Sequence, residues 1–427
     1  MNLRELKNKL RKVKAVYLAI NFGGLCAQVA ARTVFRGIAL FIPVKKNRIL
    51  FRAYEGRGYT CSPKYISEYM KNDDAYEIVW SFNNPEPYDE LRRQGIITVK
   101  QGSLQYFYYY LSSKVIVFND LLEAFLPTTG NQVYINTWHG GGAYKKWGML
   151  LDWNWMGRVR YHMTHKFNYF LSSCKLFTYY AAQAFDAKEE QFIDSGLPRD
   201  DMFFVDSATM DAKRLDILSK MKLDPNYNYV LYAPTYREFQ GSSTYDIDFP
   251  ALKQNLEDKF GGEWKILYRG HYYLENDSNI PDYVINVSSH DDMQEVLLVA
   301  DVLVTDYSSS VWDFGLLERP CFLYTPDKVE YEAVTNYCTP LEEWPYPFAL
   351  TNEALGQLIK EYDTEKYLER LHAHQERLGT YEKGQACPIV ADFIANIIKW
   401  DDVLLCRLCL WGYLLILKFI VSFHFIS

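Results

Sequence analysis

The sequence predicts an α/β protein with two mostly parallel β-sheets, each in a domain of its own. From about residue 47 onward, short apolar runs alternate with helical patterns, which is typical of βα units. A second series of this kind begins near residue 228. The 427 residues are 49% hydrophobic and 23% charged, which indicates a globular chain of two or three domains and excludes wholesale disorder, a collagen-like chain and a polytopic transporter.

Each series supplies its own strands and helices. In the first, we expect strands at Arg48–Arg52, Glu77–Phe82, Ile96–Val99, Val115–Phe118, Val133–Thr137 and Asn168–Ser172, and helices at Pro63–Met70 and Leu104–Leu111. In the second, we expect strands at Tyr229–Pro234, Trp264–Tyr268, Tyr283–Val287, Val302–Thr305 and Cys321–Tyr324, and helices at Leu252–Lys259, Asp292–Ala300 and Ser309–Leu317.

These patterns divide the chain into five parts. The predicted parts are a membrane-associating segment over 1–46, a first α/β domain over 47–205, a polar linker over 206–227, a second α/β domain over 228–390, and a C-terminal helix with an apolar tail over 391–427. Two domains joined in this way place a cleft between the carboxyl ends of their strands.

The net charge of −7 is unevenly distributed. Residues 1–50 contain eleven Lys and Arg and only one acid, Glu5, whereas the rest of the chain carries 35 cations and 52 anions. A nucleic-acid binder would place its basic patch on the folded domain, so this balance argues against nucleic acid as a partner. It favours attachment of the N-terminus to an anionic membrane surface, where each cation contributes roughly 1 kcal/mol.

The N-terminal segment combines a basic amphipathic stretch over 1–14 with a mostly apolar stretch over 15–31. An uncharged run of about 17 residues is at the short limit for a spanning helix. We expect a helix that lies in the lipid interface. A signal peptide and a helix that caps the folded domain are the alternatives.

The C-terminal residues 403–427 contain no acid and only two fixed charges, Arg407 and Lys418. Eleven residues apart, the two cations share one face of a helix. An in-plane helix is favoured narrowly over a spanning one, because Lys418 would lie deep in the bilayer. The eight cysteines show no zinc-ligand spacing, which predicts reduced thiols in a cytoplasmic protein and no metal site of their own.

The first chemical motif is Thr137-Trp138-His139-Gly140-Gly141-Gly142, directly after a predicted strand. Glycines at that place let a backbone approach a ligand, and their N–H groups can surround an anion. His139 would stand at the strand's carboxyl end as a catalytic candidate, with Gly140 and Gly141 as substrate-binding candidates. By spacing alone, a structural histidine is the more common interpretation.

The second motif is Arg269-Gly270-His271, which follows the predicted strand Trp264–Tyr268. A guanidinium can clamp a phosphate with two hydrogen bonds, and an imidazole can move a proton near neutral pH. Arg269 is therefore a substrate-binding candidate and His271 a catalytic one. On spacing alone, a surface loop explains the motif equally well.

The third motif is the most informative, because hydroxyls gather where a buried strand ends at Thr305 and a helix begins. Helix-start N–H groups together with three hydroxyls form an anion site without a lysine, and capping alone needs fewer hydroxyls. The substrate-binding candidates here are Asp306, Ser308, Ser309, Ser310 and Asp313. Thr235 and Arg237 follow another strand and are predicted to line the same cleft.

Together these stretches resemble the CDP-glycerol glycerophosphotransferase family of teichoic acid primases and polymerases. The resemblance runs in order over about residues 47–390. It rests on Cys61-Ser62-Pro63-Lys64, Gly102-Ser103-Leu104, Thr137-Trp138-His139-Gly140, Ser195-Gly196-Leu197-Pro198-Arg199-Asp200, Tyr232-Ala233-Pro234-Thr235-Tyr236-Arg237, Arg269-Gly270-His271 and Thr305-Asp306-Tyr307-Ser308-Ser309.

The resemblance implies a GT-B fold, in which two Rossmann-like domains face each other, the first on the acceptor side and the second binding the CDP-linked donor. It implies an enzyme at the cytoplasmic face of the membrane that transfers a polyol phosphate from CDP-glycerol or CDP-ribitol to a lipid-linked glycan and releases CMP. It also implies that His139 and His271 act in the cleft. Our hypothesis is that one of them takes the proton of the acceptor hydroxyl and the other stabilises the phosphoryl oxygens or the departing CMP.

No cofactor is expected beyond the CDP-polyol substrate, although Mg²⁺ carried by the nucleotide is compatible with the sequence. Gly141-Gly142 and Tyr272 depart from the family's Thr-Pro and Pro, so the donor polyol stays open. The sequence also leaves open whether the chain forms a homo-oligomer. The alternative functions are a GT-B glycosyltransferase that uses a sugar nucleotide and a non-catalytic membrane scaffold.

Overall fold

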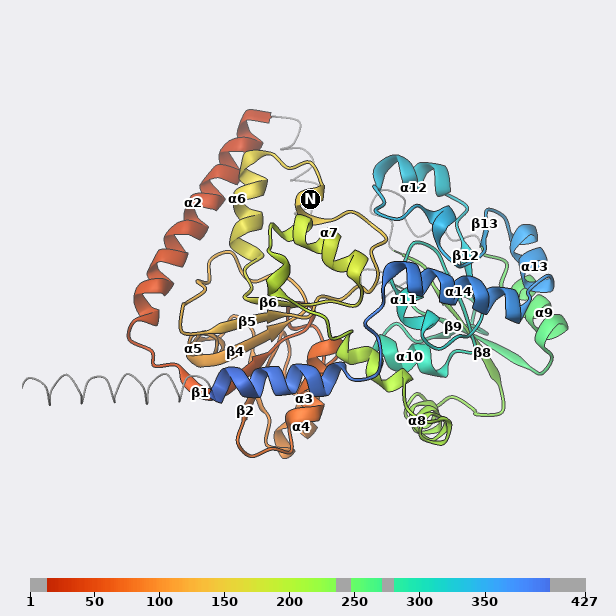
Figure 1. Cartoon of the computed structure of the whole chain (residues 1–427), viewed down its shortest axis with the longest axis horizontal. Helices are drawn as coiled ribbons and strands as arrows, with labels where there is room; N and C mark the ends of the chain where they lie inside the picture. The colour runs from red at the N-terminus through yellow and green to blue at the C-terminus, as the bar shows by residue number, and fades with distance from the viewer. Residues whose placement is uncertain (1–13, 236–246, 271–279, 400–427) are drawn as a thin grey trace, which may run out of the picture.

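The computed structural model describes residues 14–235, 247–270 and 280–399 (Figure 1). Its two sheets confirm the predicted α/β class with two parallel sheets. The first contains seven strands, β1 Lys45–Phe51, β2 Glu77–Phe82, β3 Ile97–Lys100, β4 Ser113–Phe118, β5 Val133–Asn136, β6 Tyr169–Leu171 and β7 Phe192–Ile193. The second contains six, β8 Asn228–Ala233, β9 Trp264–Tyr268, β10 Ile285–Asn286, β11 Val302–Thr305, β12 Cys321–Tyr324 and β13 Phe348–Ala349.

Helices connect and cover the strands. Those of the first lobe are α2 Lys14–Ala39, α3 Cys61–Met70, α4 Asp89–Arg93, α5 Leu104–Ser112, α6 Trp155–Thr164 and α7 Lys175–Phe185. Those that follow are α8 Ser207–Lys220, α9 Phe249–Phe260, α10 Met293–Val299, α11 Ser310–Gly315, α12 Lys328–Val334, α13 Asn352–Lys360 and α14 Thr364–Leu378. The predicted linker is thus mostly a helix, α8, and Arg214 on it pairs with Asp301 of the second lobe at 2.8 Å.

Strand order fixes where a ligand site can form. The sheets run β3-β2-β1-β4-β5-β6-β7 and β10-β9-β8-β11-β12-β13, so strand order reverses between β1 and β4 and between β8 and β11. Neighbouring pairs such as β1–β4 and β8–β11 are parallel. Ligands bind in such sheets beyond the carboxyl ends of the strands at these reversal points. The loops after β1, β4, β8 and β11 are therefore the places to search for a site.

The two lobes share buried apolar packing. One cluster runs from Phe170 of the first lobe to Trp312 and Trp344 of the second. Tyr144 stacks obliquely on Trp344 with 4.4 Å between ring centroids. The ion pairs between Lys64 and both Asp292 and Glu295, at 2.6 and 2.7 Å, also join the lobes. Apolar burial and paired charges therefore hold the lobes in one arrangement.

The end of the described chain returns to the first lobe. A helix over residues 386–399 follows α14 and lies along the first lobe in Figure 1. Val390 and Ile394 are completely buried in the cluster that contains Ile49 and Phe51 of β1. The first lobe is thus completed by residues near the C-terminus.

Helix α2 runs along the outer side of the first lobe, beside α6 (Figure 1). Arg160 of α6 donates hydrogen bonds to the side chain and backbone of Asn21 at 3.0 and 2.7 Å, and Phe22 contacts Trp155. The span Val16–Ala39 is the one helix in the described part of the chain that is long and apolar enough to cross a membrane. The expectations for residues 1–13 and 403–427 lie outside the described residues.

Candidate active site

Loops at the carboxyl edge of the first sheet hold four residues in a left-handed backbone conformation. Tyr54 and Glu55 follow β1, Cys61 begins α3 and Trp138 follows β5, with φ of 45°, 56°, 60° and 53°. Residues with a side chain adopt this region rarely, at a cost of about 1–3 kcal/mol each. Because such strain concentrates at functional sites, these loops are the first candidates.

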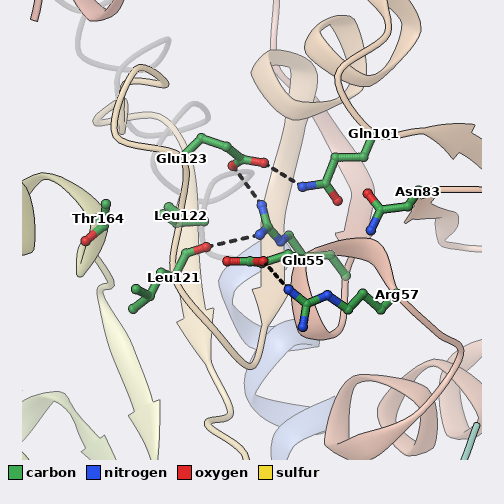
Figure 2. A pocket seen from close by; sticks show the side chains of 9 residues that line it. Glu55, Arg57, Asn83, Gln101, Leu121, Leu122, Glu123 and Thr164 are labelled. Atoms are coloured by element: carbon green, nitrogen blue, oxygen red, sulfur yellow. Dashed lines mark hydrogen bonds and ion pairs between the residues drawn. The ribbon is translucent and has the colours of Figure 1, made fainter. Parts of the chain in front are cut away.

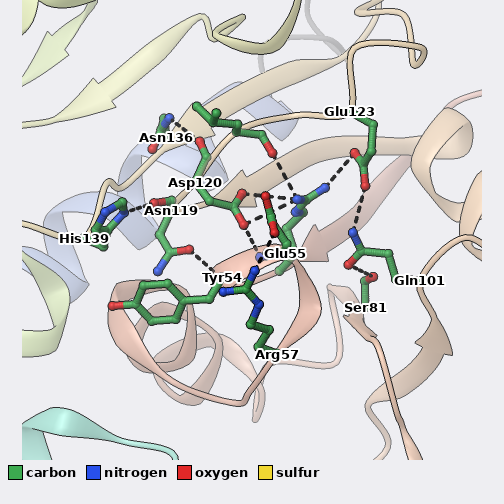
Figure 3. Close-up of polar contacts among 12 residues, drawn as sticks. Tyr54, Glu55, Arg57, Ser81, Gln101, Asn119, Asp120, Glu123, Asn136 and His139 are labelled. Atoms are coloured by element: carbon green, nitrogen blue, oxygen red, sulfur yellow. Dashed lines mark hydrogen bonds and ion pairs between the residues drawn. The ribbon is translucent and has the colours of Figure 1, made fainter. Parts of the chain in front are cut away.

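His139 stands at the end of β5 in a defined orientation (Figure 3). Its Nδ1 lies 2.7 Å from the backbone oxygen of Asn119, which can only accept, so we assign the proton to Nδ1. The ring stacks on Trp138, and burial lowers the pKa of His139 to about 4. The imidazole is therefore neutral at physiological pH. Its Nε2 bonds to no residue that the structure describes and can accept a proton.

A buried polar network holds the loop that orients His139 (Figure 3). Asn119 accepts a hydrogen bond from the Tyr54 backbone at 2.8 Å, and Asp120 accepts one from the Glu55 backbone. The Arg52 guanidinium lies 3.3 Å from Asp120. The network therefore ties the loop after β4 to the strained loop after β1, across the reversal point of the first sheet.

The glycines after His139 contact the second lobe. A Cβ on Gly140 would lie 3.5 Å from the Ser309 hydroxyl, so the first and third sequence motifs meet across the lobes. A Cβ on buried Gly141 would lie 1.8 Å from Cδ1 of Trp312. The missing side chain of Gly141 is thus required for lobe packing, and this geometry favours a packing role over the predicted phosphate contact.

Asp306 holds two strand ends together. Both of its carboxyl oxygens lie 3.0 Å from the backbone N–H of Thr235, and Oδ1 also accepts from the Tyr307 N–H at 2.6 Å. The Thr305 hydroxyl donates to the backbone oxygen of Ala233 at 2.6 Å. The predicted site residues Thr235 and Asp306 therefore meet at the reversal point of the second sheet, where Asp306 shapes the loops.

The serine cluster begins a helix shorter than predicted. Helix α11 covers six residues, Ser310–Gly315, so the macrodipole at its start is weaker than that of a long helix. The Ser310 hydroxyl donates to the Ser308 hydroxyl at 2.9 Å. Ser309 is exposed beside Gly140, and its hydroxyl bonds to nothing within the described ranges. Ser309 is therefore the serine of this cluster best placed to meet a ligand.

Arg269 directly follows β9, and its guanidinium is held by backbone carbonyls rather than by a carboxylate. Its Nη1 donates to the backbone oxygens of Val287 and His290 at 3.2 and 2.6 Å. Burial lowers the pKa of Arg269, against the attraction of Asp292. No carboxylate of the described chain lies within ion-pair distance of it. A cation anchored by carbonyls alone suits an anionic ligand such as a phosphate.

Asp313, a predicted substrate-binding residue, forms an ion pair between the lobes. Its carboxylate accepts from Arg199 at 2.9 Å and from the Gln294 amide at 2.8 Å, and its side chain is 4% exposed. Arg199 also donates to the Cys61 thiol at 3.3 Å and lies near Asp200. This geometry favours a structural role for Asp313 over the predicted substrate contact.

Two predicted site residues, His271 and Arg237, lie outside the described residues. Sequence reasoning also missed residues that the structure places at this edge, namely Arg52, Tyr54, Asn119 and Asp120. Their only sequence signal was a position at the end of a predicted strand or just after it. Within residues 14–235, 247–270 and 280–399, no group of three or more His, Cys, Asp or Glu is arranged to hold a metal ion.

The two parallel sheets, with their strand ends meeting between the lobes, define the class of the protein. It is a two-lobed α/β protein of the GT-B type. The model of the family CDP-Glycerol:Poly(glycerophosphate) glycerophosphotransferase matches residues 34–396. The chain belongs to this family, as its motifs predict.

Similar proteins agree with this assignment. The chain is 30% identical to a teichoic acid poly(glycerol phosphate) polymerase of Staphylococcus epidermidis over 83% of its own length and 51% of that protein's. It therefore spans about half the length of that relative. It is 29% identical to a polymerase of the same name from Bacillus spizizenii, over 79% and 86%. A structure of the wall teichoic acid polymerase TagF soaked with CDPG is 27% identical, with a TM-score of 0.75 over 94% of this chain and 99% of that one.

Proposed function

We propose that the chain transfers a polyol phosphate from a CDP-activated donor to a hydroxyl of a lipid-linked glycan, in the synthesis of teichoic acid or a capsule-type polymer. Glycerol is the proposed polyol, because both curated relatives above are poly(glycerol phosphate) polymerases. The observation that carries the proposal is the neutral, oriented imidazole of His139 beside Gly140 and Ser309, where the two lobes meet.

In the proposed reaction, Nε2 of His139 takes the proton of the acceptor hydroxyl while its oxygen attacks the β-phosphorus of the donor. The bond from this phosphorus to the bridging oxygen breaks, and the electron pair leaves with CMP. Arg269 and the Ser309 hydroxyl stabilise the phosphoryl oxygens. This leaves His271, two residues after Arg269, to act on the phosphoryl oxygens or the departing CMP.

The nucleotide that is released distinguishes this function from that of a sugar-nucleotide glycosyltransferase. The protein is incubated with CDP-glycerol, CDP-ribitol or a UDP-sugar and a short lipid-linked disaccharide, and released CMP and UDP are measured with the product mass. We expect CMP release and a mass gain of one or more glycerol phosphates. UDP release with a sugar mass gain would establish the sugar-nucleotide transferase, and CDP binding without turnover would establish the scaffold.

We further propose that α2 attaches the protein in the plane of the membrane's cytoplasmic face. Apolar side chains on one face of α2 are exposed, with Ile20, Val34 and Ile38 at 55%, 62% and 43%. The opposite side packs on the first lobe, where Arg160 bonds Asn21. Such lengthwise packing suits a helix that lies on a membrane better than one that crosses it.

The membrane proposal is tested by sedimentation with vesicles of phosphatidylglycerol or of phosphatidylcholine. We expect preferential binding to the anionic vesicles, and at least about tenfold weaker binding for the double variant Ile20→Glu, Val34→Glu. Val329→Glu, at a 77% exposed position on α12, is the control and should bind normally. Equal binding of both variants would contradict the role of α2.

A further inference from the structure

The first lobe contains a pocket of about 340 Å³ at the carboxyl ends of β1 to β4 (Figure 2). Four strands or their following loops supply its walls, together with the end of α6. The lining residues are Arg52, Glu55, Arg57, Asn83, Gln101, Leu121, Leu122, Glu123 and Thr164. None of them belongs to the three sequence motifs, although Arg52 and the Glu55 backbone take part in the network that holds the His139 loop.

Hydrogen bonds fix one polar wall of the pocket in advance (Figure 2). Glu123 accepts from Arg52 at 2.7 Å, from the Gln101 amide at 2.9 Å and from the Tyr106 hydroxyl at 2.9 Å. Arg52 also donates to the Leu121 backbone oxygen at 3.0 Å. A wall whose side chains are already ordered loses little conformational entropy when a ligand binds.

Other groups at the pocket are open to a ligand. Asn83 is exposed at the end of β2, and its side-chain amide bonds to no residue that the structure describes. Glu55 pairs with Arg57 at 2.8 Å, and both side chains are partly exposed, at 53% and 36%. The pocket therefore offers an exposed amide and an exposed carboxylate that can each accept or form a hydrogen bond with a ligand.

The charges of the lining select the class of ligand. Two arginines and two glutamates balance, and no lysine among the described residues lines the pocket. A phosphate would gain no net attraction from such a lining. A hydroxyl both donates and accepts, so carboxylates, carboxamides and guanidinium groups all suit it. The pocket is therefore best matched to a neutral polyol or sugar with several hydroxyls.

The position of the pocket connects it to both α2 and His139. Arg32 of α2 donates to the backbone oxygens of Ala124 and Met163, each at 3.0 Å. These carbonyls adjoin Glu123 and Thr164 of the pocket. On its other side, the loop that carries Asn119 and Asp120 leads from the pocket to His139 (Figure 3).

We infer that this pocket holds the non-reacting hydroxyls of the acceptor's terminal polyol or sugar while another hydroxyl of that unit reaches His139. The inference rests on the proposed function. A lipid-linked acceptor arrives from the membrane side, and α2 is attached to the pocket through Arg32. The donor nucleotide is instead assigned to the second lobe, where Arg269 and Ser309 lie.

Steady-state kinetics with separate variation of the two substrates tests the inference. The variants are Asn83→Leu and Gln101→Leu, and the acceptor is a short-chain lipid-linked disaccharide that ends in one glycerol phosphate. We expect the KM for this acceptor to rise at least about tenfold, while the KM for CDP-glycerol changes less than about twofold. Gln105→Leu, an exposed amide of α5 outside the pocket, is the matched control and should change neither constant.

The possible results are distinguishable. An unchanged acceptor KM in both variants, or a larger rise in the KM for CDP-glycerol, would overturn the pocket assignment while the proposed function stands. Absence of CMP release by the unmodified protein would instead overturn the proposed function. Urea unfolding of each variant identifies any loss that comes from misfolding, and Asn83→Leu, at an exposed position, should keep the unfolding midpoint of the unmodified protein.

Discussion

Replacement of Arg199 by methionine should destabilise the protein in a pH-dependent way. Arg199 and Asp313 are 2% and 4% exposed in their side chains and lie 2.9 Å apart, with fully buried Asp200 beside them. Burial raises the pKa of both Asp200 and Asp313 even with the arginine present. Without Arg199, we expect Asp313 to be neutral in the folded state and to ionise only on unfolding.

The size of this effect follows from linkage. An unfolded aspartate has a pKa of about 3.9, and each pH unit above it contributes about 1.4 kcal/mol to unfolding when the folded carboxyl stays protonated. The unfolded chain then binds fewer protons than the folded one, so the stability of the variant falls as the pH rises. Arg199→Met should lose up to about 4 kcal/mol at pH 7 and about 1.5 kcal/mol at pH 5.

Urea unfolding at the two pH values measures this loss. The matched control is Arg214→Met, because the pair between Arg214 and Asp301 is partly exposed, at 25% and 23%. Such a pair should contribute about 1 kcal/mol or less. The reasoning is refuted if Arg199→Met costs the same at both pH values, or no more than the control.

Three further predictions concern the chemistry and the contact between the lobes. His139→Ala should lower the rate of transfer at least about 10²-fold. In the unmodified protein, kcat/KM should fall on the acid side only as the pH drops through about 4, where His139 becomes protonated. A fall in kcat/KM near pH 6.5 would contradict the assignment of His139 as the base. Gly141→Ala should cost about 1–3 kcal/mol by overpacking against Trp312, measured by urea unfolding, whereas Gly130→Ala, where an added Cβ meets nothing within 4 Å, should not. Transfer should persist after dialysis against EDTA, and loss that Mg²⁺ restores would show that the nucleotide must carry the ion.

Most of the strands could be predicted because most of them are buried on both faces. The runs at β2, β9, β11 and β12 were predicted to the residue, since parallel strands read as continuous apolar segments bounded by turns. Strands β7 and β13, of two residues each, were missed. The return of residues 386–399 to the first lobe was also missed, because an amphipathic pattern does not specify its partner.

The site was predictable where a motif followed a strand and unpredictable where it depends on contacts distant in sequence. His139, Arg269 and Ser309 were identified in this way, and the structure places each beyond the end of a strand. The bond from Tyr54 to Asn119 joins residues 65 apart, which no local pattern reveals. Gly141 shows why a glycine after a strand does not by itself indicate a ligand site. The close approach of Trp312 requires a residue without a side chain, just as the close approach of a ligand would.

The return of the C-terminal helix has a consequence for synthesis on the ribosome. Val390 and Ile394 fill the space beside β1, so the first lobe stays incomplete until residue 394 has emerged. At the usual 5–20 residues per second, the wait after residue 205 is roughly 10–40 s. During that interval the apolar surface over β1 that these two side chains cover in the folded protein is exposed to water.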